Sequence, residues 1–301
     1  MTASAARARQ GFWSLTGGGV LLLAGVGVAW ALRRPQPLSM LELCWAMMRR
    51  LWGEPPPAAL SLADVPLLVV AASSLWATAV LLWAWGRGRC LLRRSQPYRP
   101  GAWPALDAAL SGLPWQPPQL RLLAVPSPLA CTLGLWRPRL LLSTGLLRQL
   151  SAAEVRAMLG HEWGHVRHGD VLRLAVLRWW RAALWFLPAV HALAQACQRA
   201  IEEAADDAAV ALTGAPLDLA AALVKTAKAR AVPAWSPALA GEAALPQRIE
   251  RLLAPAATRP RRVRFWPWGV SLAVVAGLLA LLFVPHPPPA WGQPMLLCPM
   301  R

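Results

Sequence analysis

Residues 151–170 read SAAEVRAMLGHEWGHVRHGD, and this run decides both the local fold and the chemistry available to the chain. His161 and His165 are four residues apart, and Glu162 directly follows the first histidine. Positions four apart share a face of an α-helix, so both imidazoles can reach one metal ion. Glu162 lies about 100° around the helix from His161 and can reach a water molecule at that ion. The run therefore predicts a helix with a metal site and a general base.

The same run contains a helix start signal. Ser151 and Glu154 match the S-x-x-E capping box, in which each side chain accepts a hydrogen bond from the other residue's backbone N–H. With Val155 at 0°, the face between about −60° and +40° holds Met158, Leu159, Glu162 and Val166. His161 and His165 lie together on the flank of this face, which we expect to be buried. A metal site needs such a position, partly dry yet open to a cleft. Because HExxH also occurs by chance, a third ligand is needed to support the interpretation.

The segment QRAIEEAADDAAVAL, residues 198–212, offers this third ligand. Zinc bound by HExxH takes one further protein ligand and keeps one position for water. Helical spacing places Glu202 and Asp206 at the edge of the apolar face, so we expect Glu202 to bind the metal and Asp206 to orient a histidine N–H. Glu203 and Asp207 point nearly away and suit a solvated acidic face. Glu203 is the next candidate ligand.

The composition indicates a membrane protein. Charged residues make up 15% of the 301-residue chain, against about 25% in typical soluble domains, and hydrophobic residues reach 56%. The net charge of +17 suits either nucleic acid or the inner face of a membrane, and the apolar content favours the membrane. The five cysteines show no CxxC spacing, so they indicate neither a disulfide framework nor a cysteine zinc site.

Three apolar runs are long enough to be transmembrane helices: residues 12–32, 65–85 and 265–284. Tryptophans mark their ends, as in the aromatic belts of membrane proteins. Arg7 and Arg9 precede the first run, so a signal peptide is an alternative there. The run is longer than a usual signal-peptide core and no clear cleavage site follows, which favours an uncleaved anchor.

The arginines predict the orientation. The two densest basic clusters flank residues 86–264, so the positive-inside rule places this region in the cytoplasm of a multi-pass protein of the cell (inner) membrane. Residues 33–61 then form an external loop with an amphipathic helix at the lipid surface, and residues 285–301 form a short external tail. Within the cytoplasmic region, residues 171–193 contain three arginines, which favours an interfacial or re-entrant helix over a clean span.

We expect an α+β, mainly helical fold with a small β-sheet. LRLLAV, residues 120–125, is a strand candidate, and CTLGLWRPRLLLS, residues 131–143, suggests two strands joined by a turn at residues 136–138. Two interpretations of this hairpin remain open. It is either purely structural, or one of its strands is an edge to which an extended peptide substrate adds.

The segment GLWRPRLLLSTGLLRQLSAAEVRAMLGHEWGHVRHGD resembles the catalytic segment of integral-membrane zinc peptidases of the BlaR/MecR antirepressor type, which are related to HtpX-like membrane proteases. The shared pattern is a strand–turn–strand, then HExxHxxxxD, then ExxxD, among transmembrane helices. The resemblance implies a membrane-anchored, zincin-like metalloprotease domain. It implies that His161, His165 and Glu202 bind Zn²⁺ and that Glu162 is the general base.

The same resemblance implies supporting residues, on motif positions that are less distinctive than HExxH. Asp206 matches the aspartate of the second motif, and Asp170 matches the aspartate after the second histidine. Arg248, in LPQRIERLL, matches an arginine-containing segment late in the domain. BlaR and MecR have a penicillin-binding sensor domain after the last span, whereas a short tail follows here. Antibiotic sensing by that route is therefore not expected.

Together these features predict a zinc metalloendopeptidase that cleaves a protein or peptide substrate beside a lipid bilayer, in signalling or repressor cleavage. A misfolded membrane protein, or the chain itself, is an alternative substrate. A membrane sensor or scaffold with a non-proteolytic zinc domain is the second functional class. A membrane-tethered nucleic-acid binder is disfavoured, because the densest arginine runs flank the apolar segments instead of forming a stripe. No nucleic-acid partner is expected.

Overall fold

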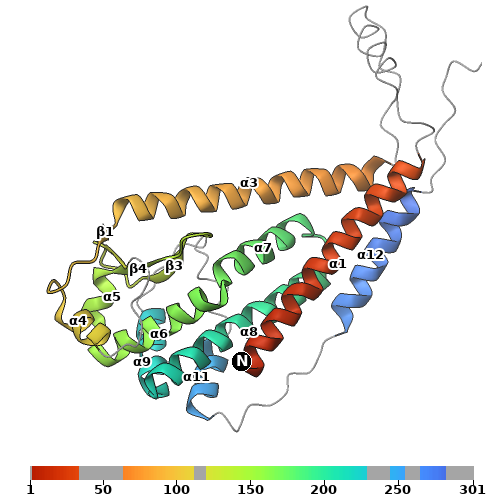
Figure 1. The fold of residues 1–301 in the computed structure, drawn as a ribbon. Coiled ribbons are helices and arrows are strands. Elements are labelled where there is room, and N and C mark those ends of the chain that lie inside the picture. Colours follow the sequence, from red (N-terminus) through yellow and green to blue (C-terminus); the bar gives the residue numbers. More distant parts are fainter. Residues whose placement is uncertain (1, 34–63, 112–119, 229–244, 255–264, 283–301) are drawn as a thin grey trace, which may run out of the picture.

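The computed structural model describes residues 2–33, 64–111, 120–228, 245–254 and 265–282 (Figure 1). Most of these residues are helical, and the strands among them form one small sheet, which confirms the expected α+β, mainly helical class. The elements in chain order are α1 (Ala3–Arg33), α3 (Val65–Arg94), β1 (Gln96–Pro97), α4 (Pro104–Ser111), β2 (Arg121–Leu123), β3 (Ala130–Leu133), β4 (Arg139–Ser143), α5 (Thr144–Gln149), α6 (Ala152–His168), α7 (Asp170–Ala183), α8 (Pro188–Thr213), α9 (Pro216–Lys228), α11 (Leu245–Leu253) and α12 (Trp266–Leu282).

The described sheet has the strand order β1-β2-β4-β3, so β1 and β3 are its edges. The expected hairpin is present: β3 and β4 pair antiparallel, with Leu133 opposite Arg139, while β2 pairs parallel with β4. Gly134 opens the hairpin turn at φ 99°, where a Cβ would lie 2.5 Å from the carbonyl oxygen of Arg137. Only glycine suits this conformation and this space. Strand β1 has two residues and is too short to leave a periodic pattern in the sequence.

Helix α6 begins as the sequence predicts. The Ser151 hydroxyl accepts a hydrogen bond from the Glu154 N–H at 3.2 Å, and the Glu154 carboxylate accepts one from the Ser151 N–H at 2.8 Å. The helix ends at Gly169, whose φ of 67° is left-handed. At Gly164 a Cβ would lie 2.9 Å from the Cα of Ala205, so α6 and α8 pack almost backbone to backbone. This close packing places the HEWGH motif against the acidic residues of α8.

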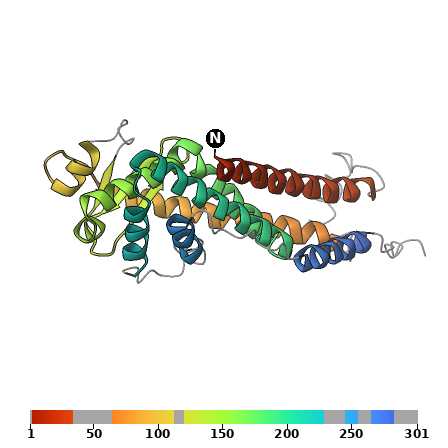
Figure 2. The ribbon, with the colours of Figure 1, turned by 90° about the horizontal axis from the view of Figure 1, so that it is seen from below.

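Two hydrophobic cores organise the described helices. The first lies between the sheet and helices α4, α5, α6 and α9, and Leu142, Leu146 and Leu159 are fully buried in it. The second lies between α1, α7 and α8, with Leu177 and Ile201 at its centre. Figure 2 shows that α1, α12 and the first half of α3 extend together, away from the end of the molecule that holds the sheet.

Helices α1 and α3 are long and apolar enough to cross a membrane. Residues 3–29 reach a mean hydropathy of 1.7 and residues 65–94 reach 2.1, and only 17% and 22% of these apolar stretches are buried. Core helices of soluble proteins are mostly buried, so this exposure is what a lipid-facing helix requires. Helix α12 is apolar but shorter, and the three-span topology stays a prediction. The surface helix expected in the external loop, and the expected tail, lie outside the described residues.

The segment 171–193, expected as one interfacial or re-entrant helix, consists of most of α7, a turn, and the start of α8. The indole N–H of Trp185 in this turn donates to the Ser73 hydroxyl of α3 at 3.2 Å. The indole N–H of Trp179 donates to Thr78, one turn further along α3, at 3.1 Å. The corner between α7 and α8 therefore packs against the apolar part of α3.

Candidate metal centre

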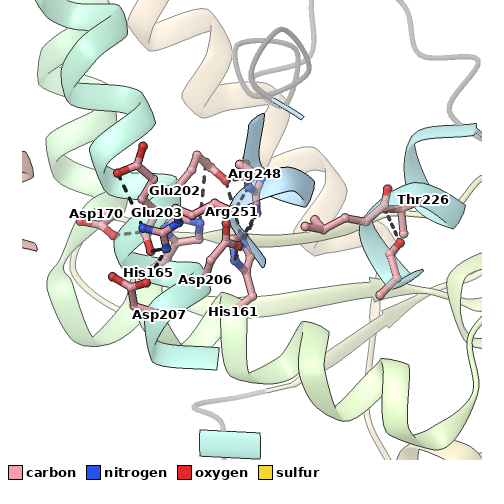
Figure 3. A network of polar contacts seen from close by, with 12 residues as sticks. His161, His165, Asp170, Glu202, Glu203, Asp206, Asp207, Thr226, Arg248 and Arg251 are labelled. Carbon is pink, nitrogen blue, oxygen red and sulfur yellow. Dashed lines mark hydrogen bonds and ion pairs between the residues drawn. The ribbon is translucent and has the colours of Figure 1, made fainter. Parts of the chain in front are cut away.

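Two histidines of α6 and one glutamate of α8 converge on one point (Figure 3). His161, His165 and Glu202 each offer a ligand atom, and these atoms lie within 4.8 Å of one another. Nε2 of His161 is 3.6 Å from Oε2 of Glu202, and Nε2 of His165 is 3.8 Å from Oε1 of the same carboxylate. The histidines are buried, whereas 20% of the Glu202 side chain is exposed. The structure thus brings together the three residues expected as metal ligands.

A buried carboxylate lies behind each histidine. Oδ1 of Asp206 is 3.0 Å from Nδ1 of His161, and Oδ2 of Asp170 is 3.1 Å from Nδ1 of His165. When Nδ1–H donates to a carboxylate, Nε2 keeps its lone pair for a metal, and the ring is held in one orientation. Both histidines therefore present Nε2 to Glu202. The two aspartates expected as supporting residues lie where this role requires them.

Arg248 of α11 joins the acidic residues of the centre. Its Nη1 is 2.8 Å from Oε2 of Glu202, and its Nε and Nη2 donate to the two oxygens of Asp206 at 2.9 and 2.6 Å. A two-pronged contact of this kind fixes a carboxylate in angle as well as in position. The buried Arg248 also offsets the repulsion between two carboxylates that are one helical turn apart.

Glu162 is buried on the side of the centre that faces β3. The hydroxyl of Thr132, on β3, donates to Oε2 of Glu162 at 2.9 Å. The contact of Thr132 is not predictable from the sequence, because no local pattern connects a strand residue to a helix residue thirty positions later. Its only sequence signal is a hydroxyl group within the predicted hairpin, for which a substrate-binding edge is one of the two open interpretations.

The charges of the centre favour a cation. Burial opposes protonation of His165, but its hydrogen bond to Asp170 and the charges of Glu202 and Glu162 outweigh burial and raise its pKa to about 9. Burial also acts to raise the pKa of Glu202, yet Arg248 and the two histidines hold that pKa below its ordinary value. Glu202 is therefore ionised at neutral pH. A positive charge beside the imidazoles is stabilised from several directions.

Glu203 and Asp207 lie on the other side of α8, as expected, but they do not form a solvated acidic face. Arg251 of α11 pairs with Asp207, and its Nη1 lies 3.7 Å from Oε2 of Glu203. Arg7 of α1 also pairs with Glu203, at 3.0 Å. These ion pairs connect α1, α8 and α11. Since helical geometry directs Glu203 into them, Glu202 is the glutamate that reaches the histidines.

The donor set suits a four-coordinate zinc ion. Zinc binds imidazole nitrogen and carboxylate oxygen at about 2.0–2.2 Å, which separates tetrahedral ligand atoms by about 3.4 Å. The separations between Glu202 and the two imidazoles, 3.6 and 3.8 Å, are close to this value. The three ligand atoms together lie within 4.8 Å of one another, a wider spacing that metal binding would have to close. Two imidazoles and one carboxylate would hold three positions of such an ion, and among the described residues this group has three members, so the fourth position would be left for water, as in catalytic zinc sites.

A helical HExxH motif joined by a glutamate from a second helix, on a chain with long apolar helices, defines a class: membrane-associated proteases. The family described as BlaR1 peptidase M56 matches residues 55–252, more than half of the chain, and the chain belongs to this family. A segment of 63 residues is 41% identical to the Protease HtpX of Nitrosococcus oceani. That segment covers 20% of this chain and 21% of the relative, so the match spans about a fifth of the relative's length. The resemblance drawn from the sequence is confirmed.

Proposed function

We propose that the protein is a membrane-bound, zinc-dependent endopeptidase that hydrolyses peptide bonds of a protein substrate. One observation supports this above the others: the nitrogen and oxygen atoms of His161, His165 and Glu202 converge while a buried carboxylate holds Nδ1 of each histidine. A structural zinc site would be closed by a fourth protein ligand. With a glutamate beside an open fourth position, the arrangement suits hydrolysis.

The proposed mechanism assigns separate tasks to the residues of the centre. Zinc, when bound by the three ligands, polarises the scissile carbonyl and lowers the pKa of water. Glu162 takes a proton from the attacking water and passes it to the leaving amine. Thr132 restricts the rotation of the Glu162 carboxylate by holding one of its oxygens. Arg248 keeps Glu202 ionised and in place.

Strand β3 supports the interpretation of the hairpin as a substrate edge. It is an edge of the described sheet, and its Thr132 touches the proposed base. An extended peptide that adds to β3 by backbone hydrogen bonds would pass alongside the metal centre. Specificity would then depend on side chains at alternate positions of the substrate, because successive residues of a strand point to opposite faces.

We further propose that α1, α3 and α12 span the membrane and that the metal centre faces the cytoplasm. The basic residues that follow the apolar part of α3 support this orientation under the positive-inside rule. A cytoplasmic site suits a regulatory substrate such as a repressor, which is the role that the resemblance to antirepressor peptidases suggests. Comparing the peptide fragments in cells that make the native protein or Glu162→Gln would identify the substrate.

The decisive test is the Glu162→Gln substitution in purified protein. The amide cannot accept the proton, so we expect proteolysis to fall by about 10²-fold or more, while zinc measured by elemental analysis stays at the native level. Glu203→Gln, on helix α8 and directed away from the histidines, is the matched control and should retain activity. Full activity in Glu162→Gln would contradict the mechanism.

A second comparison tests the third ligand. Glu202→Gln should lose zinc, because a neutral amide is a poor ligand for this ion, whereas Glu203→Gln should keep it. Zinc bound by native protein without cleavage of any substrate in cells would favour the sensor or scaffold class instead.

A further inference from the structure

The turn between β3 and β4 exposes apolar side chains at the end of the hairpin. Trp136 at the tip is 90% exposed, and its neighbours Leu135 and Arg137 are exposed as well. Gly134 fixes the turn in a conformation that only glycine adopts readily, so the tip is a defined structure. Trp136 and Leu135 together expose a contiguous apolar surface, and surfaces of this kind are associated with contacts to membranes or to other proteins.

The hairpin lies beside the part of α3 where the apolar stretch ends. The side chain of Leu133, the last residue of β3, packs 3.8 Å from the position of a Cβ at Gly88 of α3. Figure 1 shows the sheet alongside the half of α3 that leads into β1. Within this half, Arg87 stacks on the ring of Trp83 at 4.9 Å. In membrane proteins tryptophans are enriched at the membrane–water interface, and arginines are in excess just beyond it on the cytoplasmic side.

We propose that the hairpin tip, residues 134–138, docks into the headgroup layer of an anionic bilayer. The inference rests on the proposed function, which places α3 across the membrane. Both the tip and the end of α3 combine tryptophan with arginine: Arg87 and Arg89 lie over tryptophan rings of α3, as Arg137 follows Trp136 in the tip. The contact between Leu133 and Gly88 places the start of the tip beside this part of α3. Tryptophan prefers the interface between headgroups and hydrocarbon, and arginine pairs there with lipid phosphates.

Docking of the tip specifies the substrate class. Thr132, which touches the proposed base, precedes Trp136 by four residues. At about 3.3 Å per strand residue, Thr132 then lies within about 13 Å of the docked Trp136 along the strand, and the proposed base is in contact with Thr132. A peptide that adds to β3 would be cleaved close to the membrane surface. The preferred scissile bonds therefore lie near the bilayer, in a membrane protein or in a regulatory protein held at the membrane surface.

Spin labels in proteoliposomes of phosphatidylethanolamine and phosphatidylglycerol test the docking. In a full-length chain without its own cysteines, one nitroxide is placed at Leu135→Cys in the tip, at the exposed Leu75→Cys of α3, or at the exposed Gln149→Cys of α5. Labels at positions 135 and 75 should collide more with oxygen, which concentrates in the bilayer, than with a water-soluble nickel complex. The label at position 149 should show the reverse.

The three labels separate the possible failures. If position 135 behaves as position 149 does while position 75 is in lipid, the tip faces water or a protein, and the docking is overturned while the membrane protease remains. If position 75 is also in water, the proposed membrane placement of α3 fails, and the docking with it.

A functional comparison uses single substitutions of Trp136 in the native chain. Trp136→Ser should lower cleavage of a membrane-tethered reporter, with its target site next to the span, by about fivefold. It should leave cleavage of the same sequence as a soluble peptide in detergent unchanged. Trp136→Phe should restore part of the loss. Equal losses on both substrates, or no loss on either, would overturn the inference.

Discussion

At the scale of single residues, the side chains of the metal centre work in pairs. His161 is held by Asp206 from behind, and Glu162 is held by Thr132 from the side. Asp206 and Thr132 do not take part in the proposed reaction directly. Each limits the rotation of its partner side chain, and Asp206 also holds the proton of His161 on Nδ1. Such partners commonly change metal affinity or activity by one to two orders of magnitude when they are removed.

Asp206→Asn is expected to weaken zinc binding by about 10–100-fold. The amide can still contact His161, but it lacks the negative charge that makes Nε2 a stronger ligand and that pairs with Arg248. Competition with a chelator at fixed pH measures the affinity. Asp207→Asn is the matched control, because Asp207 pairs with Arg251 away from the histidines. Equal affinities in the two variants would contradict the role given to Asp206.

Thr132→Val is expected to lower kcat by about tenfold, because a hydrogen bond to a charged group is worth about 1.5–3 kcal/mol. The isosteric valine leaves Glu162 free to rotate, so zinc content and KM should stay near native values. Thr132→Ser keeps the hydroxyl and should retain most of the activity. A loss of folding, seen as a lower Tm in Thr132→Val alone, would indicate a structural role instead.

At the scale of elements, helix α6 depends on contacts at its first turn. Glu154 completes the capping box with Ser151 and also forms a 2.7 Å ion pair with Lys225 of α9. Burial acts to raise the pKa of Glu154, but Lys225 and Ser151 outweigh it and hold the pKa below its ordinary value. A lowered folded-state pKa stabilises the protein above the unfolded-state pKa, and this contribution is lost as the pH falls through the folded-state value.

Glu154→Gln is therefore expected to lower stability at pH 7 by about 1 kcal/mol, and the difference from the native protein should shrink in acid. Thermal unfolding in detergent at pH 7 and at about pH 4 provides the comparison. The exposed Glu250→Gln should change stability by less than about 0.5 kcal/mol at either pH. A pH-independent difference for Glu154→Gln would show that its charge is not involved.

At the scale of the whole molecule, the centre lies between the sheet and the helices that extend away from it. Helix α8 packs against both α1 and α6, so one helix carries residues of the metal centre and also contacts a candidate membrane span. Arg251 of α11 forms ion pairs with Glu203 and Asp207, so α11 is also held against α8. The centre is thus built where α8 joins the sheet end of the molecule to a candidate membrane span, a position consistent with the proposed function at a membrane.

The proposed orientation predicts that exposed residues of the sheet end face the cytoplasm. A cysteine at Gln149, in a chain without its own cysteines, should react with a membrane-impermeant maleimide in inside-out vesicles. In intact cells it should react only after detergent is added. Labelling of intact cells without detergent would reverse the topology while leaving the metal centre unaffected.

Much of this protein could be predicted from short-range patterns. The capping box at Ser151, the pairing of His161 with His165, and the choice of Glu202 over Glu203 all follow from the geometry of a single helix. The apolar runs and the hairpin are equally local, because each depends on hydrophobic periodicity or on turn residues. These features could be inferred because a helix or strand relates neighbouring residues by a fixed repeat.

Contacts between distant segments required the tertiary structure. Nothing in the sequence near Thr132 indicates that it meets Glu162, and the acidic face assigned to Glu203 proved to be paired with arginines of α1 and α11. Even where the supporting residues were expected, their partners depended on how α6 and α8 pack at Gly164. The sequence determined by itself which side chains share a helix face. The tertiary structure decided which faces meet, because that depends on the packing of the whole core.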